Sequence, residues 1–216
     1  MATRSLAARQ TAAPLVPPGP LSAVRKAALG CRACHLWTLG TQTVFGVGPA
    51  HAKVMMVGEA PGDQEDREGE PFVGPAGKLL DAGLAAARID RSTVYLTGVV
   101  KHFKWKRVGK SERRIHQKPN AAEIAACLPW LDAEIDRVRP RVLVCLGSTA
   151  AQALLGRGFR VTAQRGVPVE SALAPIVIAT VHPASVLRAP DPAARRSAEQ
   201  EFFDDIRVIG KYVRRA

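Results

Sequence analysis

The sequence predicts an α/β fold, a three-layer sandwich in which helices flank a central, mostly parallel sheet of four strands. Short apolar runs with the length of buried strands alternate with segments of helical periodicity. The runs are apolar on consecutive residues, as expected for strands that are covered on both faces. The 216 residues, 47% of them hydrophobic, are enough for one sizeable core, and no linker divides them.

Each element is assigned from its own pattern. The strand-like apolar runs are Lys53–Gly58, Thr93–Val100, Arg141–Leu146 and Ile176–Val181. The helical patterns are Leu21–Leu29, Ala76–Arg88, Asn120–Val138, Ser148–Leu155 and Ala193–Val213. The helix at 120–138 is the clearest, because apolar residues recur there every three or four positions and form one buried stripe.

Residues 1–20 are expected to form a disordered, basic, proline-rich tail, and residues 21–216 the folded domain. The tail is rich in Ala, Pro, Thr and Arg, and no Asp or Glu precedes Glu59. Such an acid-free start is also typical of a transit peptide, but it lacks the apolar core of a secretory signal. A cytoplasmic location is therefore the expectation.

The charge of the chain indicates a polyanionic partner. The formal net charge is +12 and the isoelectric point is about 10.2, which suits nucleic acid or an acidic membrane surface. No run of 18 apolar residues predicts a membrane span, and no lipid-anchor motif or basic amphipathic anchor favours a membrane. We expect a nucleic-acid partner, no membrane, and a monomer.

The most informative segment joins the first strand to the next helix. It reads GEAPGDQED from Gly58 and continues through PFVGPAG from Pro71. It begins at the carboxyl end of a strand, the edge at which open α/β sheets bind ligands. Its backbone amides can bind the edge of a flat polar ring while Phe72 stacks on that ring. A solvated acidic loop is the alternative.

Four cysteines are candidate metal ligands. Cys31 and Cys34 form a CxxC pair, whereas Cys127 lies on a helix and Cys145 at the end of a strand. In a chain of intracellular character, metal binding is favoured over disulfides. A zinc ribbon usually needs a second close pair, but an iron–sulfur cluster accepts ligands from separate elements. An iron–sulfur cluster is the prediction, with zinc or ordinary buried thiols as alternatives.

Residues 101–118 form a basic segment, KHFKWKRVGKSERRIHQK, with eight Lys or Arg and one acid. Cationic side chains at this density suit phosphate groups, and Phe103 and Trp105 can stack on unpaired bases. A solvated charged loop is the alternative. Cationic neighbours disfavour imidazolium, so His116 is expected to stay neutral and nucleophilic. A phosphate contact is the plainer interpretation of the same histidine.

A second histidine follows the last predicted strand in the segment HPASVLR, which begins at His182. Its position after a parallel strand predicts that it lies at the same edge of the sheet as Glu59. The segment offers an imidazole donor, together with a hydroxyl and backbone amides for a phosphate. Ordinary turn chemistry is the alternative.

Taken together, these features resemble the uracil-DNA glycosylase superfamily from about Leu21 to Val213. The blocks GEAPGDQED and PFVGPAG are similar to the first family motif, and HPASVLR is similar to the second. The four cysteines resemble the pattern of the iron–sulfur family 4 enzymes. The insertion GKSERRIHQKP resembles that of the X group, whose members become covalently attached to uracil-containing DNA through a histidine. The resemblance implies a [4Fe-4S] cluster and uracil-containing DNA, preferably single-stranded, as the partner.

The resemblance also implies roles for individual residues. His182 donates to the carbonyl oxygen of the departing base, and His116 captures the anomeric carbon of the sugar. Glu59 orients His116 and takes up its proton, while Asp63 organises the pocket or its water. The implied base-binding residues are Gly58, Ala60, Pro61, Gly62, Phe72 and Gly98. The implied DNA contacts are Lys101, Lys110, Arg113, Arg114, Lys118, Ser185 and Arg188.

Two positions depart from the family pattern. Gly98 stands where family members usually have an asparagine that reads uracil, and glycine has no side chain with which to distinguish uracil from cytosine. Ala60 stands where the X group commonly has glutamine. A hydrolytic family 4 enzyme and a non-catalytic binder of damaged or abasic single strands are therefore the alternative functions.

Overall fold

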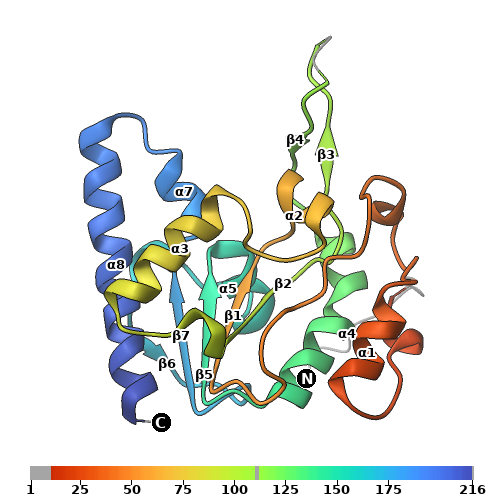
Figure 1. Ribbon diagram of the computed structural model, residues 1–216, viewed down its shortest axis with the longest axis horizontal. Helices are drawn as coiled ribbons and strands as arrows, with labels where there is room; N and C mark the ends of the chain where they lie inside the picture. Colours follow the sequence, from red (N-terminus) through yellow and green to blue (C-terminus); the bar gives the residue numbers. More distant parts are fainter. Residues whose placement is uncertain (1–10, 110–111, 216) are drawn as a thin grey trace.

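The computed structural model describes residues 11–109 and 112–215, and it confirms the predicted α/β sandwich (Figure 1). The central sheet has five strands, not four, in the order β2-β1-β5-β7-β6. The parallel strands are β1 (Val54–Gly58), β2 (Val94–Gly98), β5 (Val142–Leu146) and β7 (Ile176–Thr180). The additional strand, β6 (Pro168–Val169), pairs antiparallel with β7 at the edge. Two residues carry no periodicity, so the sequence alone did not reveal it.

Alternate residues of each strand face opposite helical layers. On β1, Met55 and Val57 belong to one buried core, whereas Val54 and Met56 belong to another. Both faces of the central strands are therefore covered, which explains their unbroken apolar sequences. The helices of the first layer are α1 (Leu21–Ala28), α4 (Ala121–Val138) and α5 (Ser148–Leu155), and those of the second are α3 (Pro75–Ala86) and α8 (Pro192–Arg215).

The longest helix, α8, closes the second layer. Its Phe202, Ile206 and Ile209 are fully buried at spacings of three and four residues, as expected for one apolar stripe. Gly83 of α3 allows close approach, because a Cβ atom there would lie 3.3 Å from the Phe202 ring. Within the described ranges, no helix combines the length and apolar character needed to cross a membrane.

The remaining helices are short. Helix α2 (Asp63–Glu68) forms inside the segment predicted as a loop. The Glu65 carboxylate accepts the Gly62 N–H at 3.0 Å. Three acids in the first turn also stabilise the helix, because they lie at the positive end of its dipole. Gly69, with φ of 80°, ends it. The other short elements are α6 (Val161–Gln164), α7 (Pro183–Leu187) and 3₁₀ helices at Ala13–Leu15, His35–Thr38 and Arg91–Thr93.

The basic segment forms a hairpin that projects from the body beside α2 (Figure 1). Its strands, β3 (Trp105–Lys106) and β4 (Ile115–His116), are antiparallel, and Trp105 lies opposite His116. The Trp105 indole donates to the Leu39 carbonyl at 2.8 Å, which fastens the base of the hairpin. The segment was predicted as a loop, because two-residue strands in a basic sequence give no alternating pattern.

The amino-terminal segment differs from the predicted disordered tail over the residues that the structure describes. Ala12 is fully buried, and its N–H donates to the Ala126 carbonyl of α4 at 2.9 Å. Arg137 of α4 donates to the carbonyls of Pro17 and Gly19. Residues 11–20 therefore pack on α4 through backbone groups that composition does not reveal. The rest of the predicted tail, residues 1–10, lies outside the described residues.

Candidate active site

The carboxyl ends of the parallel strands bring the predicted residues to one edge of the sheet. Glu59 follows β1, Gly98 ends β2, and His182 follows β7. Thr149, which follows β5 by three residues, joins them. Because neighbouring strands are parallel and in register, these four positions lie side by side.

Phe72 packs against two glycines at this edge, in the region predicted to bind the base, which we call the pocket. The Phe72 ring stacks with His182, with ring centroids 6.1 Å apart and an angle of 24° between the planes. A Cβ atom on Gly58 would lie 2.7 Å from the Phe72 ring, and one on Gly77 would lie 1.7 Å from the Phe72 carbonyl oxygen. Both glycines are therefore required for the ring to lie over the end of β1. Phe72 itself has φ of 60°, which is rare for an aromatic residue.

His182 is a neutral hydrogen-bond donor in this pocket. Its Nδ1 accepts the Ala184 N–H at 3.1 Å, so the proton of the neutral ring is assigned to Nε2. Burial lowers the pKa of His182 to about 4, and the nearby Arg188 and His116 contribute to the shift. Nε2 lies 3.4 Å from the position of a Cβ atom on Gly58, so the donor is directed over the end of β1.

Glu59 is held between Thr149 and His116. Its Oε2 accepts a short hydrogen bond from the Thr149 hydroxyl, and its Oε1 lies 3.7 Å from His116 Nε2. That separation is longer than a hydrogen bond, so the two groups are adjacent without being bonded. Burial and, to a smaller extent, Arg188 lower the pKa of His116, whereas Glu59 acts in the opposite direction. The site therefore pairs a carboxylate with an imidazole that is neutral at pH 7.

The hairpin that carries His116 is anchored to α2 by Arg114. The Phe103 ring stacks with His116 at a centroid distance of 6.0 Å, and the Arg114 guanidinium lies over the Phe103 ring, 5.2 Å from its centroid. Arg114 also binds the carboxylates of Asp63 and Asp66, the latter at 2.6 Å. Its side chain is 12% exposed, and protein groups use its donors. Arg114 thus anchors the hairpin, and its contact with DNA stays a prediction.

Asp63 binds the Arg114 guanidinium that anchors the hairpin. Burial opposes ionisation, but hydrogen bonds from Arg67 and Arg114 lower the pKa of Asp63. The carboxylate predicted to organise the pocket or its water is thus bound by two guanidinium groups. Sequence reasoning missed Asp66, which is fully buried and also accepts the Thr41 N–H at 2.8 Å. An acid in an acidic loop gives no signal that it is buried.

Lys101 was also predicted to contact DNA, and this prediction is wrong. Its side chain is 1% exposed, and its ammonium lies 2.5 Å from the Glu134 carboxylate, which is completely buried. The first residue of a basic run gave no indication that it lies in the core. Among the other predicted DNA contacts, Lys110 lies outside the described residues. The exposed ones are Arg113, Lys118, Ser185 and Arg188.

The backbone of the loop after β1 is fixed by a residue that sequence reasoning missed. The Glu65 carboxylate accepts the Gly62 N–H at 3.0 Å and the Gly74 N–H at 2.9 Å, so it bridges the two halves of the loop. Pro61 is buried, and Ala60 is partly buried against the core. The predicted base-binding backbone is therefore held in one conformation.

Gly98 borders the pocket from the end of β2. A Cβ atom at this position would lie 3.2 Å from the Val100 carbonyl oxygen, 3.5 Å from that of Glu59 and 3.6 Å from the Ala60 Cα. A side chain at 98 would thus project between Glu59 and Ala60. Glycine leaves this part of the pocket lined by backbone alone.

The cysteines are free and lie in or against one core. The pKa of Cys127 is raised to about 12, chiefly by burial and in part by the charges of Cys31 and Cys34. The Trp130 indole N–H donates to Cys31 Sγ at 3.2 Å, and the Lys101 backbone N–H donates to Cys127 Sγ at 3.3 Å. Burial alone raises the pKa of Cys145 to about 12. Among the described residues, no three ligands are close enough to close a metal site.

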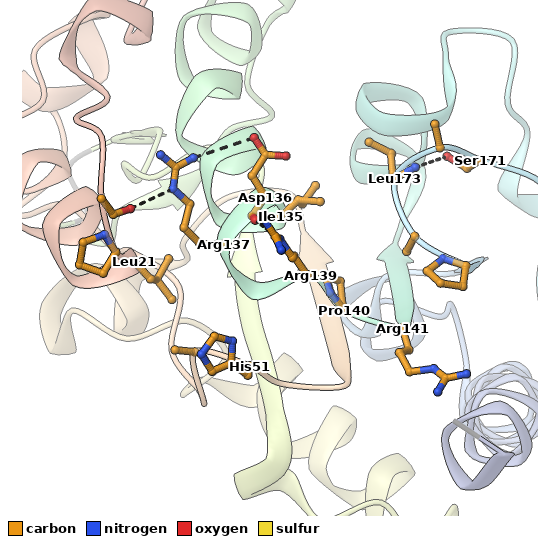
Figure 2. A pocket seen from close by; sticks show the side chains of 16 residues that line it. Leu21, His51, Ile135, Asp136, Arg137, Arg139, Pro140, Arg141, Ser171 and Leu173 are labelled. Atoms are coloured by element: carbon orange, nitrogen blue, oxygen red, sulfur yellow. Dashed lines mark hydrogen bonds and ion pairs between the residues drawn. The ribbon is translucent and has the colours of Figure 1, made fainter.

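A large cleft at the opposite edge of the sheet contains none of the predicted site residues (Figure 2). Its volume is about 1130 Å³, and its lining residues precede β1, β5 and β7, end α4 or lie at the start of α1. Arg137 there donates to backbone carbonyls of the amino-terminal segment, and Arg139 to the Asp136 carbonyl. These arginines stabilise the carboxyl end of α4, where cations are favourable. The cleft is therefore not the candidate active site.

Comparison with known proteins gives consistent matches. Residues 45–207 match the Uracil DNA glycosylase superfamily. The chain is 35% identical over 192 residues to a Type-4 uracil-DNA glycosylase of Sulfurisphaera tokodaii, a similarity that covers 84% of this chain and 81% of the relative. It is 34% identical over 197 residues to that of Archaeoglobus fulgidus, covering 85% and 88%. It is 37% identical over 159 residues to that of Thermotoga maritima, covering 73% and 78%.

Proposed function

Since the chain belongs to the uracil DNA glycosylase superfamily, we propose that it cleaves the bond between uracil and deoxyribose in DNA. One observation carries the proposal: Glu59, Phe72 and His182 converge on one pocket at the carboxyl edge of the sheet. The family match covers all three residues. Relatives whose names record this activity share about a third of their residues with the chain.

The pocket residues recognise the base and stabilise its departure. The target nucleotide leaves its stack, which costs a few kcal/mol, and the base then lies against Phe72. His182 donates from Nε2 to the carbonyl oxygen that gains negative charge as the glycosidic bond breaks. A histidine whose pKa is about 4 stays neutral at pH 7, so this donation needs no proton uptake.

Glu59 acts on the sugar. Breaking the glycosidic bond leaves the electron pair on uracil and a positive charge on the deoxyribose. The Glu59 carboxylate, fixed by the Thr149 hydroxyl, stabilises this cation. In a hydrolytic reaction, water forms the new bond to C1′ and transfers one proton to Glu59, and an abasic site is released.

We propose that His116 captures the sugar in this chain. A nitrogen lone pair of the neutral imidazole forms a bond to C1′ as uracil leaves with the electrons of the broken bond. The imidazole proton passes to Glu59, whose Oε1 lies 3.7 Å from Nε2. The lowered pKa of His116 supports the role, since a neutral imidazole has a lone pair available. The linkage is not hydrolysed, so each molecule acts once.

Hydrolysis without capture is the second candidate. The three relatives compared above are named Type-4 uracil-DNA glycosylases, and the His116 side chain is 40% exposed, which leaves room for water. In that reaction His116 contacts DNA and the protein turns over. Binding of damaged strands without catalysis is disfavoured by the arrangement of Glu59 and His182.

We also propose that the four cysteines hold a [4Fe-4S] cluster. The electrostatic effect of Cys31 and Cys34 on the Cys127 thiol supports it, as do the N–H donors to the sulfurs of Cys31 and Cys127, which typically tune such clusters. When bound, the cluster joins the amino-terminal segment to α4 and β5. Iron and sulfide analysis tests this, and Cys34→Ser should lose both. Stoichiometric zinc instead would contradict it.

The proposed substrate is single-stranded DNA that contains uracil, since an unpaired base is removed from its stack at the lowest cost. The exposed Arg113, Lys118 and Arg188 beside the site support binding to its phosphates. We propose that the protein acts as a monomer in the cytoplasm.

A denaturing gel tests the proposed function. The full chain is incubated with a single-stranded oligonucleotide that contains one uracil, and separately with the matched cytosine oligonucleotide. We expect release of free uracil and a band of protein-linked DNA with the uracil strand only. Free abasic product without that band would leave the hydrolytic candidate. No uracil release would overturn the proposed function.

A further inference from the structure

A buried ion pair beneath the pocket has no part in the chemistry above. The side chains of Lys101 and Glu134 are 1% and 0% exposed, and their charged atoms lie 2.5 Å apart. Removing two charges from water costs several kcal/mol per ion, so such a pair contributes little net stability. Lysine and glutamate are almost never fully buried unless paired. The position of this ion pair is therefore more informative than its contribution to stability.

Lys101 supports the turn that follows β2. Its ammonium donates to the Gly98 carbonyl at 2.7 Å. The next two peptide groups bind the neighbouring strand end: Val99 N–H donates to the Gly58 carbonyl and Val100 N–H to the Glu59 carbonyl, each at 3.0 Å. The ammonium thus fixes a turn whose amides fix the backbone of Glu59.

The partner of Lys101 is itself fully bound. The Glu134 carboxylate accepts hydrogen bonds from the Tyr95 hydroxyl at 2.9 Å, the Gly46 N–H at 3.0 Å and the Thr97 hydroxyl at 3.0 Å. A satisfied buried network of this kind has one geometry and rigidifies what it touches. Glu134 therefore sets where the ammonium lies.

The same residue reaches the cysteines through its backbone. Lys101 N–H donates to Cys127 Sγ at 3.3 Å, and Cys127 lies on α4, the helix that carries Glu134. Helix α4 therefore holds Lys101 at two points, by its main chain and by its side chain. The turn of residues 98–100 lies between these two contacts.

We propose that Lys101 is a positioning residue for base excision: it holds the turn of residues 98–100, and through that turn the Glu59 carboxylate, at the place where the sugar reacts. The proposal rests on the proposed function. Lys101, although it belongs to the basic segment, thus acts inside the protein and does not contact DNA.

The test replaces both charges at once with Lys101→Met and Glu134→Leu, because removing one would leave the other buried and unpaired. Arg91→Met is the control, since its ion pair with Asp81, at 2.8 Å, is partly exposed and lies just before the start of β2. We expect the single-turnover rate of uracil release to fall by about 100-fold in the double variant, as for a misplacement of about 1 Å. The Kd for single-stranded uracil DNA should change by less than about twofold, as should both quantities in the control.

A second measurement does not depend on activity. Amide hydrogen exchange of Val99 and Val100 should be faster in the double variant than in the unmodified chain and unchanged in Arg91→Met. Glu134→Gln keeps the shape of the core and should give an intermediate increase, so the test holds even if the double variant does not fold. Unchanged exchange in Glu134→Gln, or a double variant with the original rate, would overturn the proposal. Faster exchange combined with no uracil release by the unmodified chain would reject the proposed function and retain the anchoring of the turn.

Discussion

The two histidines of the site belong to regions that are built differently. His182 follows a central strand, its Nδ1 is bound by the backbone of α7, and burial lowers its pKa to about 4. His116 lies on a two-residue strand of a projecting hairpin, is 40% exposed, and lies 3.7 Å from Glu59. The base-recognition region takes its rigidity from the sheet, whereas the region with His116 is attached to it by a few polar contacts. Base release and sugar capture should therefore be separable.

Replacing His116 should have the largest effect, because it abolishes sugar capture and leaves uracil release. In His116→Ala, we expect the protein-linked band to disappear completely while uracil release continues with multiple turnovers, because water replaces the imidazole at C1′. Uracil release under excess substrate is the measurement. A variant that still becomes attached to DNA would show that another residue is the nucleophile.

Arg114→Met should detach the hairpin at a large cost in stability. It leaves the fully buried Asp66 without its cation, which typically costs about 3–5 kcal/mol. Urea unfolding measures this cost, and Arg67→Met is the control, because its exposed pair with Asp63 contributes at most about 1 kcal/mol. We also expect capture to fall more than uracil release. Equal stability losses in the two variants would contradict the anchoring role.

His182 should make stability depend on pH. Its pKa is about 4 when folded and 6.5 as an ordinary histidine, so the unfolded chain binds the proton first as the pH falls. The stabilisation is complete above pH 6.5 and is lost progressively towards pH 4, by about 3 kcal/mol in total. The free energy of unfolding, measured with urea between pH 4 and 7, should depend less steeply on pH in His182→Asn than in the unmodified chain. The same slope in both proteins would contradict a buried neutral imidazole.

The smallest effect is expected at the exposed surface. Lys118→Ala should weaken binding to single-stranded DNA of any sequence and reduce the slope of log K against log salt by about 1, as for one lost phosphate contact. The rate of uracil release at saturating DNA should not change. A change in that rate with an unaltered slope would place Lys118 in the chemistry instead of on the phosphates.

The sheet and the positions of Glu59 and His182 at its carboxyl edge could be predicted because they depend on local patterns. Unbroken apolar runs identified β1, β2, β5 and β7, and parallel strands necessarily bring their carboxyl ends to one edge. Glu59 and His182 could therefore be placed together from the sequence. The five predicted helices were also found, within about two residues at each boundary, whereas the short helices α2, α6 and α7 were not predicted.

What could not be predicted depends on tertiary contacts between charged residues. Lys101 and Arg114 belong to one basic run, yet one is buried against Glu134 and the other is bound to Asp66. Composition treats every lysine and arginine of that run as a phosphate contact. Thr149 was missed because a threonine near the start of a helix has no signal that its hydroxyl binds a carboxylate from another strand.

The most direct test of the account is to locate the bond between protein and DNA. The full chain is allowed to react with single-stranded uracil DNA, the product is digested with nuclease and protease, and the peptides are sequenced by mass spectrometry. The account predicts a deoxyribose remnant on the peptide that contains His116, and on its imidazole. A remnant on any other residue, or unmodified peptides together with free abasic DNA, would contradict capture by His116.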